Sequence, residues 1–469
     1  MSKNRKTVHY DGTCDFCKVV VSKLDTNKVR LSDASRSSLP KGITKKQAME
    51  EIHLVDSDGK IYKNIDVILE IVKTYKFGGL LYKIGHLPGI HRMLQIFYKI
   101  VASNRHDIVG QNSRLFWTKN VISLGFISGI VASLNLWTTD RTYPLVPIFD
   151  SFARADWLGI ITPITIIALL IGILLSPKWR YLSVIFLFLL ILIVLTDQST
   201  LQPWVYQYSF MLGVIAYTGI KSKSLISTTA NLQLLIGSIY ILSGSYKLNA
   251  DFFVNTFPWL LSPVTDRLLF LTNSLNSLGI YIALFEIVLG VLLLVPRTRQ
   301  LGIYCAVMMH IGILLLLSPL GLNWNSAIWP WNVTMITLVL ILFWNDKVPS
   351  IKYAFENKKL ALSITVLFIV LPAIGHIGHW DSYLSFSLYS GNTTGAYIQS
   401  SLVPSSRANV SGWSQSELNV PAYPEPRVYK SILQSICMQD STASMRLYKR
   451  RTLKQWSIEK ERLDCNSVR

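Results

Sequence analysis

Apolar segments long enough to cross a lipid bilayer dominate the middle of this 469-residue chain, and they constrain its fold more than any other feature. A membrane-spanning helix needs about 20 mainly apolar residues, and from Phe116 onward we count about nine such segments. They cover residues 117–137, 156–175, 181–196, 203–220, 229–246, 277–295, 300–318, 327–345 and 359–378. The stretch 251–276 is broken by proline, so we expect it to lie at the membrane interface. The sequence therefore predicts a polytopic α-helical membrane bundle.

Loop charge predicts how this bundle is oriented. The start, MSKNRKTVHYDG, has no apolar run of a signal peptide, so we expect a cytoplasmic N-terminus. The inner loops then carry Lys178, Arg180, Lys221, Lys223, Arg297, Arg299, Lys347, Lys352, Lys358 and Lys359, and the outer loops carry Arg141, Arg154, Lys247 and Arg267. The excess of basic residues in the inner loops over the outer loops agrees with the positive-inside rule. An odd number of spans places residues 381–469 outside, where we expect a small extracytoplasmic C-terminal domain.

The net charge of +19 does not indicate a nucleic-acid partner. The basic residues lie in short loops and in the two ends, where they face lipid headgroups. The sequence contains no zinc finger, RNA-binding signature or basic stripe with interleaved aromatic residues. We therefore expect membrane lipids, and no nucleic acid, among the partners.

Residues 1–107 alternate strand-like and helix-like patterns. TVHYD reads as a strand, CDFCKVVVSKL as an amphipathic helix, and EIHLVDSDGKIYKN as a hairpin with Asp58-Gly59 in its turn. IDVILEIVKTY and GIHRMLQIFYKIVASNRH follow as helices. This order predicts a small thioredoxin-like α/β domain.

Cys14 and Cys17 lie at the expected N-terminus of the first helix. Backbone N–H groups there stabilise a thiolate on the first cysteine, and the second is placed to resolve a mixed disulfide. A zinc site would need two more ligands, which no nearby Cys or His pair supplies. We favour a redox pair; a structural or vestigial pair is the alternative. Cys437 and Cys465 can form a disulfide only if their Cα atoms lie within about 7 Å, which the sequence leaves open.

YDGTCDFC and the later hairpin IHLVDSDGKIY resemble the DCC family of thiol-disulfide oxidoreductase-like domains. The resemblance covers about the first 107 residues and depends on the Asp-x-x-Cys-x-x-Cys pattern that begins at Asp11. It implies a thioredoxin-like fold with Cys14 and Cys17 as the redox residues.

A second pattern, IYILSGSYKLNADFF, places Lys247 at the end of the fifth expected span. From the residues alone, a lysine snorkelling at a helix end is the ordinary interpretation. The stretch is, however, similar to the one that carries the catalytic lysine in the vitamin K-dependent γ-glutamyl carboxylase family and its bacterial HTTM relatives. This resemblance extends over residues 115–380, with VPRTRQ and His310 as further landmarks.

That resemblance implies a defined chemistry for Lys247. In the family, an amine deprotonates a reduced naphthoquinone (vitamin K or menaquinol), and O2 converts the anion into a base that removes the γ-proton of a glutamate. The carbanion then captures CO2, so a glutamate-containing protein or peptide is the implied substrate, and no metal is expected. Burial against apolar helices and quinone favours the neutral amine that acts as a base.

Glu286 and His310 lie mid-span, where ionisable groups are costly and usually have a partner. We expect them to pair near the quinone, with a purely structural pair as the alternative. Trp204, Trp324, Trp329 and Asn325 are the candidate quinone-binding residues, and an outer aromatic belt is the alternative. The loop TDQSTLQPWVYQ keeps Trp204 but lacks the histidine that the carboxylases carry there.

The leading hypothesis is a quinol-dependent oxygenase or carboxylase-like enzyme of the bacterial inner membrane, with an appended dithiol domain. One alternative is a membrane thiol–quinone oxidoreductase that uses Cys14 and Cys17. Another is a non-enzymatic bundle that binds or transports a lipophile.

Overall fold

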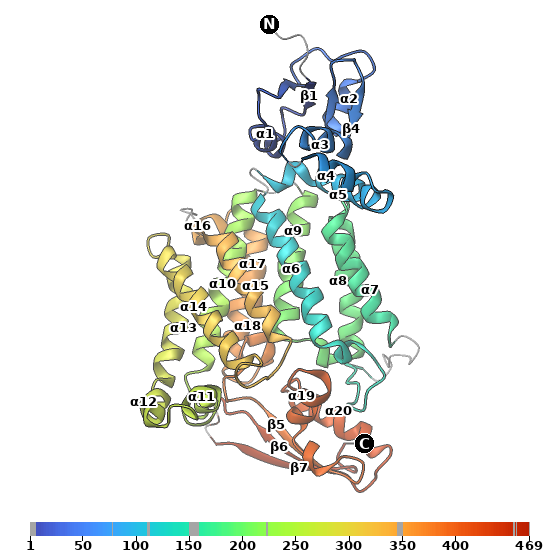
Figure 1. The fold of residues 1–469 in the computed structure, drawn as a ribbon. Coiled ribbons are helices and arrows are strands. Elements are labelled where there is room, and N and C mark those ends of the chain that lie inside the picture. Colours follow the sequence, from blue (N-terminus) through green and yellow to red (C-terminus); the bar gives the residue numbers. More distant parts are fainter. Residues whose placement is uncertain are drawn as a thin grey trace. The chain divides into compact units, whose positions relative to one another are not determined.

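The computed structural model describes residues 6–76, 78–109, 113–149, 159–221, 224–344, 350–453, 455 and 457–468. The chain divides into two compact units (Figure 1). The first comprises Met1–Trp117 with Leu175–Pro177, and the second comprises Thr118–Leu174 with Lys178–Arg469.

The first unit is built on a four-stranded mixed sheet in the order β2-β1-β3-β4. β1 (Lys6–Tyr10) pairs in parallel with β2 (Val29–Asp33) and antiparallel with β3 (His53–Val55), and β3 pairs with β4 (Ile61–Lys63). The predicted hairpin is confirmed, and Gly59 takes the left-handed backbone conformation that its turn requires (φ +78°).

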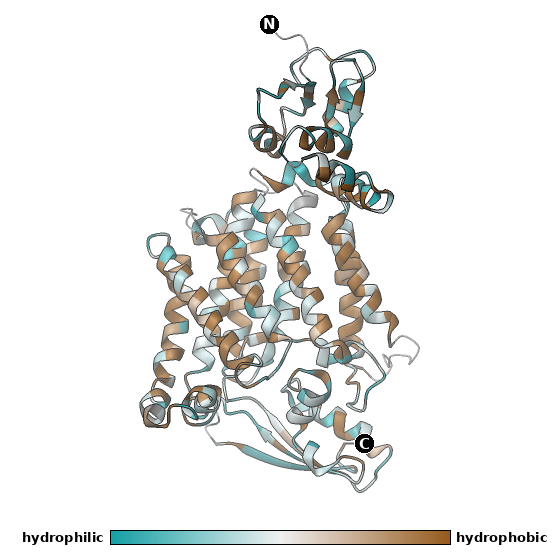
Figure 2. Cartoon of the chain, viewed as in Figure 1, coloured by the Kyte–Doolittle hydropathy of each residue, from teal (hydrophilic) through white to brown (hydrophobic). Residues whose placement is uncertain are grey.

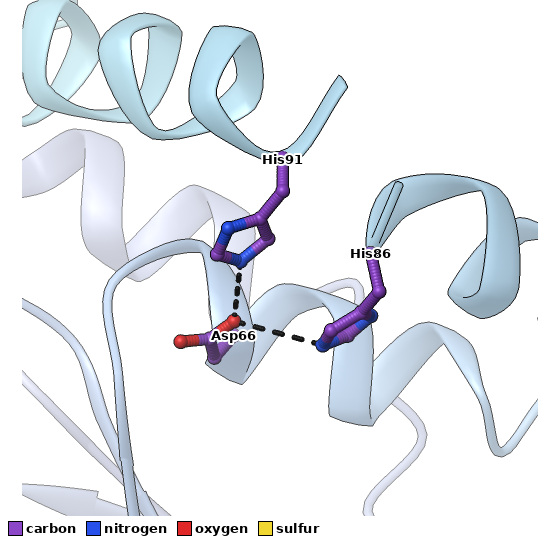
Figure 3. A group of neighbouring side chains, drawn as sticks. All are labelled: Asp66, His86 and His91. Carbon is purple, nitrogen blue, oxygen red and sulfur yellow. Dashed lines mark hydrogen bonds and ion pairs between the residues drawn. The ribbon is translucent and has the colours of Figure 1, made fainter. Parts of the chain in front are cut away.

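Among its described residues, the first unit also contains the helices α1 (Asp15–Val21), α2 (Lys45–Glu50), α3 (Ile65–Val72), α4 (Gly78–Gly85) and α5 (Pro88–Ile108). The core contains Val8, Val29, Leu54, Val67 and Ile71, which come from the sheet and α3. Asp66, His86 and His91 meet where α3, α4 and α5 come together (Figure 3). The unit is thus the mixed α/β region that the sequence predicts.

The second unit contains the apolar helices, which are mostly brown in Figure 2. They are α6 (Ser113–Ala132, which begins in the first unit), α7 (Ile161–Leu175), α8 (Trp179–Thr196), α9 (Pro203–Lys221), α10 (Leu225–Tyr246), α13 (Gly279–Leu294), α14 (Arg299–Leu317), α15 (Ile328–Phe343), α17 (Lys358–Thr365) and α18 (Leu371–Gly375). Shorter helices are α11 (Phe257–Thr265), α12 (Thr272–Asn276) and α16 (Ser350–Ala354). The proline-broken stretch therefore forms short helices.

Six helical segments among the described residues are long and apolar enough to cross a membrane. They are α6, α8, α10, α14, the stretch Ser274–Leu294 that ends with α13, and the stretch Lys358–Gly375 that runs from α17 to α18. Helices α7, α9 and α15 occupy the other three predicted ranges, so the total of about nine crossings stays a prediction. Arg154, Lys223 and Lys347, which enter the orientation argument, lie outside the described residues.

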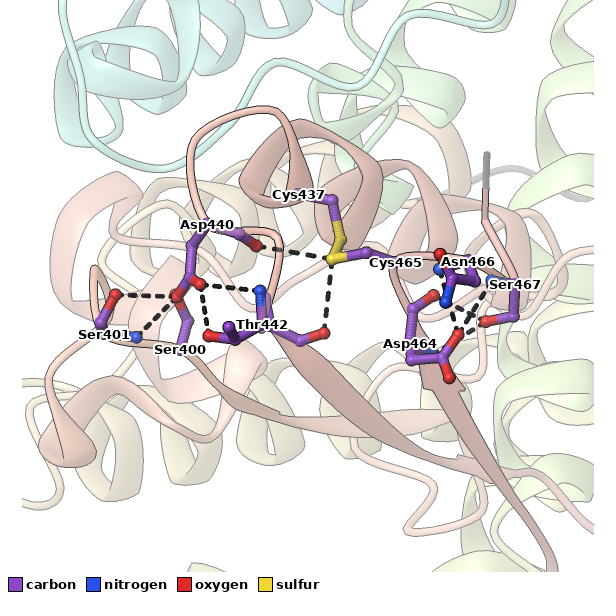
Figure 4. The surroundings of a disulfide bond; sticks show 10 residues. Ser400, Ser401, Cys437, Asp440, Thr442, Asp464, Cys465, Asn466 and Ser467 are labelled. Atoms are coloured by element: carbon purple, nitrogen blue, oxygen red, sulfur yellow. Dashed lines mark hydrogen bonds between the residues drawn. A yellow bond between two sulfur atoms is a disulfide. The ribbon is translucent and has the colours of Figure 1, made fainter.

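The last part of the chain belongs to the same compact unit as the helices. Its antiparallel sheet consists of β5 (Gly395–Gln399), β6 (Ser444–Lys449) and β7 (Glu459–Asp464), with helices α19 (Val410–Leu418) and α20 (Pro426–Cys437) beside it. A disulfide joins Cys437 to Cys465, whose Cα atoms are 5.5 Å apart (Figure 4). Nearby, the Asp440 carboxylate accepts hydrogen bonds from the hydroxyl groups of Ser400, Ser401 and Thr442.

Candidate functional site

The two cysteines of the first unit occupy the N-terminus of α1. Cys14 is the N-cap residue, and its Sγ accepts the backbone N–H of Cys17 at 3.2 Å. Cys14 is fully buried, whereas Cys17 is partly exposed, and both are free thiols. Cys14 thus lies at the helix N-terminus, where the sequence places it, with a backbone N–H directed at its sulfur.

Residues from the distant end of α5 cover the dithiol. The Cys14 thiol lies 3.8 Å from the backbone carbonyl oxygen of Arg105. The guanidinium of Arg105 donates to the carbonyl groups of Met49, Glu50 and Ala102, which fixes this end of α5 on the domain. Sequence reasoning missed Arg105 because 91 residues separate it from Cys14.

Asp11 brings a buried carboxylate to the same place. Its Oδ1 accepts hydrogen bonds from the backbone N–H and the hydroxyl group of Thr13. Its Oδ2 lies 3.6 Å from the Arg105 guanidinium and 3.3 Å from Nε2 of His106. The aspartate of the Asp-x-x-Cys-x-x-Cys pattern thus links the cysteine loop to α5.

The electrostatic surroundings of Cys17 affect how its thiol titrates. Burial, together with the hydrogen bond and charge of Cys14, raises the pKa of the Cys17 thiol well above its ordinary value. Asp11 acts in the same direction and Arg105 in the opposite one. Ionisation of the Cys17 thiol is therefore disfavoured.

A large apolar cavity adjoins the dithiol inside the first unit. Its volume is about 730 Å³, and Cys17 and Asp11 form part of its wall. The remaining lining comes mainly from apolar side chains of α1, α3 and α5, including Phe16, Ile68 and Phe97. A cavity of this size and character suits an apolar ligand or an apolar part of a larger substrate.

In the second unit, Lys247 and Glu286 form an ion pair. Lys247 is the C-cap residue of α10, and its Nζ lies 2.6 Å from Oε2 of Glu286 on α13 and 2.7 Å from Oγ of Ser243. Both side chains are nearly buried, at 13% and 10% exposed. Glycines let the two helices approach closely, because a Cβ on Gly244 would lie 2.7 Å from the Ala283 carbonyl oxygen.

The predicted pairing of Glu286 with His310 is wrong. The His310 ring instead lies 2.7 Å from the Tyr240 hydroxyl group through Nε2 and 2.7 Å from Oδ1 of Asn332 through Nδ1. Both nitrogens of the imidazole are thus satisfied by neutral groups. The physical reason is that Lys247 offers the carboxylate an opposite charge, which neutral histidine does not.

The aromatic residues expected at a quinone site fall into separate groups. Trp204 is buried and packs with Phe126, Trp137 and Tyr208. The Trp324 ring centroid lies 5.5 Å from that of Trp259, while the Trp329 indole donates to the Leu317 carbonyl group.

Asn325 follows Trp324 in the sequence, is buried, and takes the left-handed backbone conformation. The assignment of Asn325 and the three tryptophans to a quinone site stays a prediction.

Comparison with known proteins adds one match. No curated protein and no solved structure matches the chain. A family model described as DCC1-like thiol-disulfide oxidoreductase matches residues 8–111, which contain both cysteines, Asp11 and Arg105. The first unit therefore carries a DCC1-like thiol-disulfide oxidoreductase domain, joined to a chain with several helices apolar enough to span a membrane.

Proposed function

We propose that the protein is a membrane-bound thiol–disulfide oxidoreductase in which Cys14 and Cys17 are the redox pair. The observation that carries this proposal is the dithiol at the N-terminus of α1, with Cys17 opening onto an apolar cavity. The family match of residues 8–111 supports it.

The geometry favours one order of events. In the oxidised form, a substrate thiolate attacks Sγ of Cys17, because Cys14 is fully buried beneath Arg105. The Cys14–Cys17 bond breaks, and Cys14 leaves as a thiolate that the Cys17 N–H stabilises. A second substrate thiol then attacks the mixed disulfide and displaces Cys17, which takes up a proton. The substrate is left as a disulfide and the domain as a dithiol.

Reoxidation of the dithiol needs a two-electron acceptor. The apolar cavity beside Cys17 fits a lipophilic quinone, to which the dithiol passes two electrons and two protons while the Cys14–Cys17 bond forms. This is the thiol–quinone alternative of the sequence interpretation. From the charges of the loops, we propose that the chain lies in the bacterial inner membrane, with a cytoplasmic N-terminus and an extracytoplasmic C-terminal region.

Trapping of a mixed disulfide tests which sulfur a substrate meets. The full-length protein in detergent is incubated with oxidised glutathione and then analysed by intact mass. The variant Cys14→Ser should retain one glutathione on Cys17, because the residue that releases it is missing. The variant Cys17→Ser should be modified far more slowly, since Cys14 is covered. Cys305→Ser, which changes the free cysteine of α14, should behave as the wild type. Faster modification of Cys17→Ser than of Cys14→Ser would contradict the assigned order.

A second candidate function depends on the Lys247–Glu286 pair in the helical body. Here Lys247 would accept a proton from a reduced naphthoquinone, in the presence of O2 and CO2, as the resemblance of residues 115–380 to the carboxylase family implies. Only a neutral amine can act as a base, so the Lys247–Glu286 contact must open, or its proton must move to the carboxylate, before this step. Trp204, Trp324, Trp329, Asn325 and His310 would then surround the quinone, and a glutamate-containing peptide would be the substrate.

Epoxide formation distinguishes the two candidates. The purified protein is supplied with chemically reduced menaquinone or vitamin K under air, and epoxide is measured by mass spectrometry. The second candidate requires epoxide in the wild type, its loss in Lys247→Ala, and its retention in Lys359→Ala at the exposed start of α17. Absence of epoxide from folded protein would remove this candidate. Specific quinone binding that is insensitive to both Lys247 and the cysteines would instead favour a non-enzymatic lipophile-binding bundle.

A further inference from the structure

Three side chains from α3, from the residue after α4 and from α5 converge on one point (Figure 3). Asp66 lies in the first turn of α3, His86 follows the end of α4, and His91 lies in the first turn of α5. Both imidazoles present Nε2 to the same carboxylate oxygen, Oδ1 of Asp66, at 3.8 Å from His86 and 2.8 Å from His91. All three ligand atoms lie within 4.8 Å of one another.

The hydrogen bonds of His86 prepare its Nε2 as a ligand atom. The Nδ1 of His86 lies 2.9 Å from the carbonyl oxygen of Tyr82, so this nitrogen carries the proton and donates it. Nε2 of the neutral ring then keeps its lone pair. Histidines that bind metals typically make such a second hydrogen bond to a backbone carbonyl group or a carboxylate, which fixes the tautomer and the ring orientation.

The charge at the site also suits a cation. In the part of the chain that the structure describes, the ion pairs of Asp66 are with these two histidines alone, and no lysine or arginine lies within ion-pair distance. The Asp66 carboxylate thus supplies an oxygen ligand of the kind that a divalent cation binds, beside the two imidazoles. The side chains of Asp66 and His86 are each 38% exposed and that of His91 is 24% exposed, so an ion can reach the site from solvent.

We propose that Asp66, His86 and His91 bind one divalent transition-metal ion such as Zn²⁺. Two imidazole nitrogens and one carboxylate oxygen form a ligand set that Zn²⁺ accepts, with water at the fourth position. Ligand atoms on a tetrahedral zinc ion lie about 3.3 Å apart, since each is about 2.0–2.1 Å from the metal. At 2.8 Å, Nε2–H of His91 donates a hydrogen bond to Asp66, so metal binding requires this proton to move to Nδ1 and the two side chains to separate slightly. The 3.8 Å contact of His86 needs a comparably small movement in the opposite direction.

Metal binding would join α3, the end of α4 and the start of α5. Helices α3 and α5 also line the cavity beside Cys17, through Ile68 and Phe97 among others. The ion would therefore hold together two walls of that cavity without contacting either sulfur. The metal site does not depend on the proposed redox function.

A zinc titration tests this site in the full-length protein. The experiment uses detergent-solubilised protein with Cys14→Ser and Cys17→Ser, because the thiols would otherwise compete for the ion. After treatment with a chelator and its removal, Zn²⁺ is titrated against a chromogenic chelator. We expect one equivalent to bind, and we expect His86→Ala or Asp66→Asn to weaken binding by at least about tenfold. His379→Ala, at an exposed histidine outside the cluster, is the matched control and should leave the affinity unchanged.

The visible spectrum of Co²⁺ provides a readout that a loss of folding cannot imitate. Co²⁺ bound by two imidazoles and a carboxylate in a four-coordinate site should give d–d bands that disappear in His86→Ala, while the variant keeps the circular dichroism of the parent protein. Lack of saturable Zn²⁺ binding would overturn the proposal. So would equal affinity in the His86→Ala, Asp66→Asn and His379→Ala proteins, because the cluster would then be a hydrogen-bonded group without a metal.

Discussion

At the scale of single residues, the surroundings of Cys17 determine how its thiol titrates. Burial, Cys14 and the nearby Asp11 charge all raise the pKa of the Cys17 thiol. Replacement of Asp11 by Asn removes one negative charge, so the Cys17 thiolate should form at lower pH. The measurement is the pH profile of Cys17 alkylation, followed by peptide mass spectrometry. A profile that stays in place or moves to higher pH in Asp11→Asn would contradict the electrostatic account.

A substitution at Glu286 tests how much the Lys247–Glu286 ion pair contributes to the stability of the helical body. The variant Glu286→Gln leaves the nearly buried Lys247 ammonium without its counter-charge, which typically costs about 3–5 kcal/mol. We expect a lower melting temperature in detergent, and a partial recovery in the double variant Lys247→Met with Glu286→Gln, which removes both charges. Equal stability of the wild type and Glu286→Gln would show that the pair contributes little.

The candidate functional residues could be predicted from the sequence, whereas the residues that they contact could not. The Cys-x-x-Cys spacing marks the dithiol, because both cysteines lie within one turn of a helix. Arg105, which covers Cys14, is brought there by the packing of α5, and no local pattern indicates it. Similarly, Lys247 and Glu286 were both candidates, but the choice of Lys247 rather than His310 as the partner of Glu286 depends on how α10 and α13 pack.

At the scale of elements, the close packing of α10 and α13 depends on small residues. A Cβ on Gly290 would lie 2.6 Å from the carbonyl oxygen of Gly237, so one helix would have to move. We expect Gly290→Ala to lower the free energy of unfolding by about 1–3 kcal/mol, measured as thermal stability in detergent. Gly312→Ala on α14 is the matched control, because a Cβ there meets nothing within 4 Å. A gain in stability for Gly290→Ala like that expected for Gly312→Ala would show that helix propensity, not packing, dominates at this contact.

Elements with strong periodicity or long apolar runs were predictable. All nine predicted apolar ranges contain a helix in the structure, and the β3–β4 hairpin follows its Asp-Gly turn. Three short elements of the first unit, β2, α2 and α4, were missed. β2 has one fully buried residue, and α2 has six residues that are held by a capping box between Thr44 and Gln47. Such elements form through tertiary pairing and capping, and their apolar pattern is weak.

At the scale of the whole molecule, the family match and the dithiol site both lie in the first unit. Residues 8–111 match a thiol-disulfide oxidoreductase family, and the dithiol, Asp11 and the apolar cavity all lie within that range. The helical body contributes membrane-length helices and the Lys247–Glu286 pair. We therefore propose that electron transfer takes place in the first unit and that the second unit attaches the protein to the membrane.

A redox titration of Cys14 and Cys17 tests this account most directly. The full-length protein is equilibrated in glutathione buffers of increasing oxidation and alkylated, and each cysteine is quantified by mass spectrometry. The account predicts that Cys14 and Cys17 lose their free thiols together, as one two-electron couple that forms an internal disulfide, and that Cys17→Ser abolishes this transition. Two cysteines that stay reduced at every ratio, or that are only glutathionylated one by one, would contradict it.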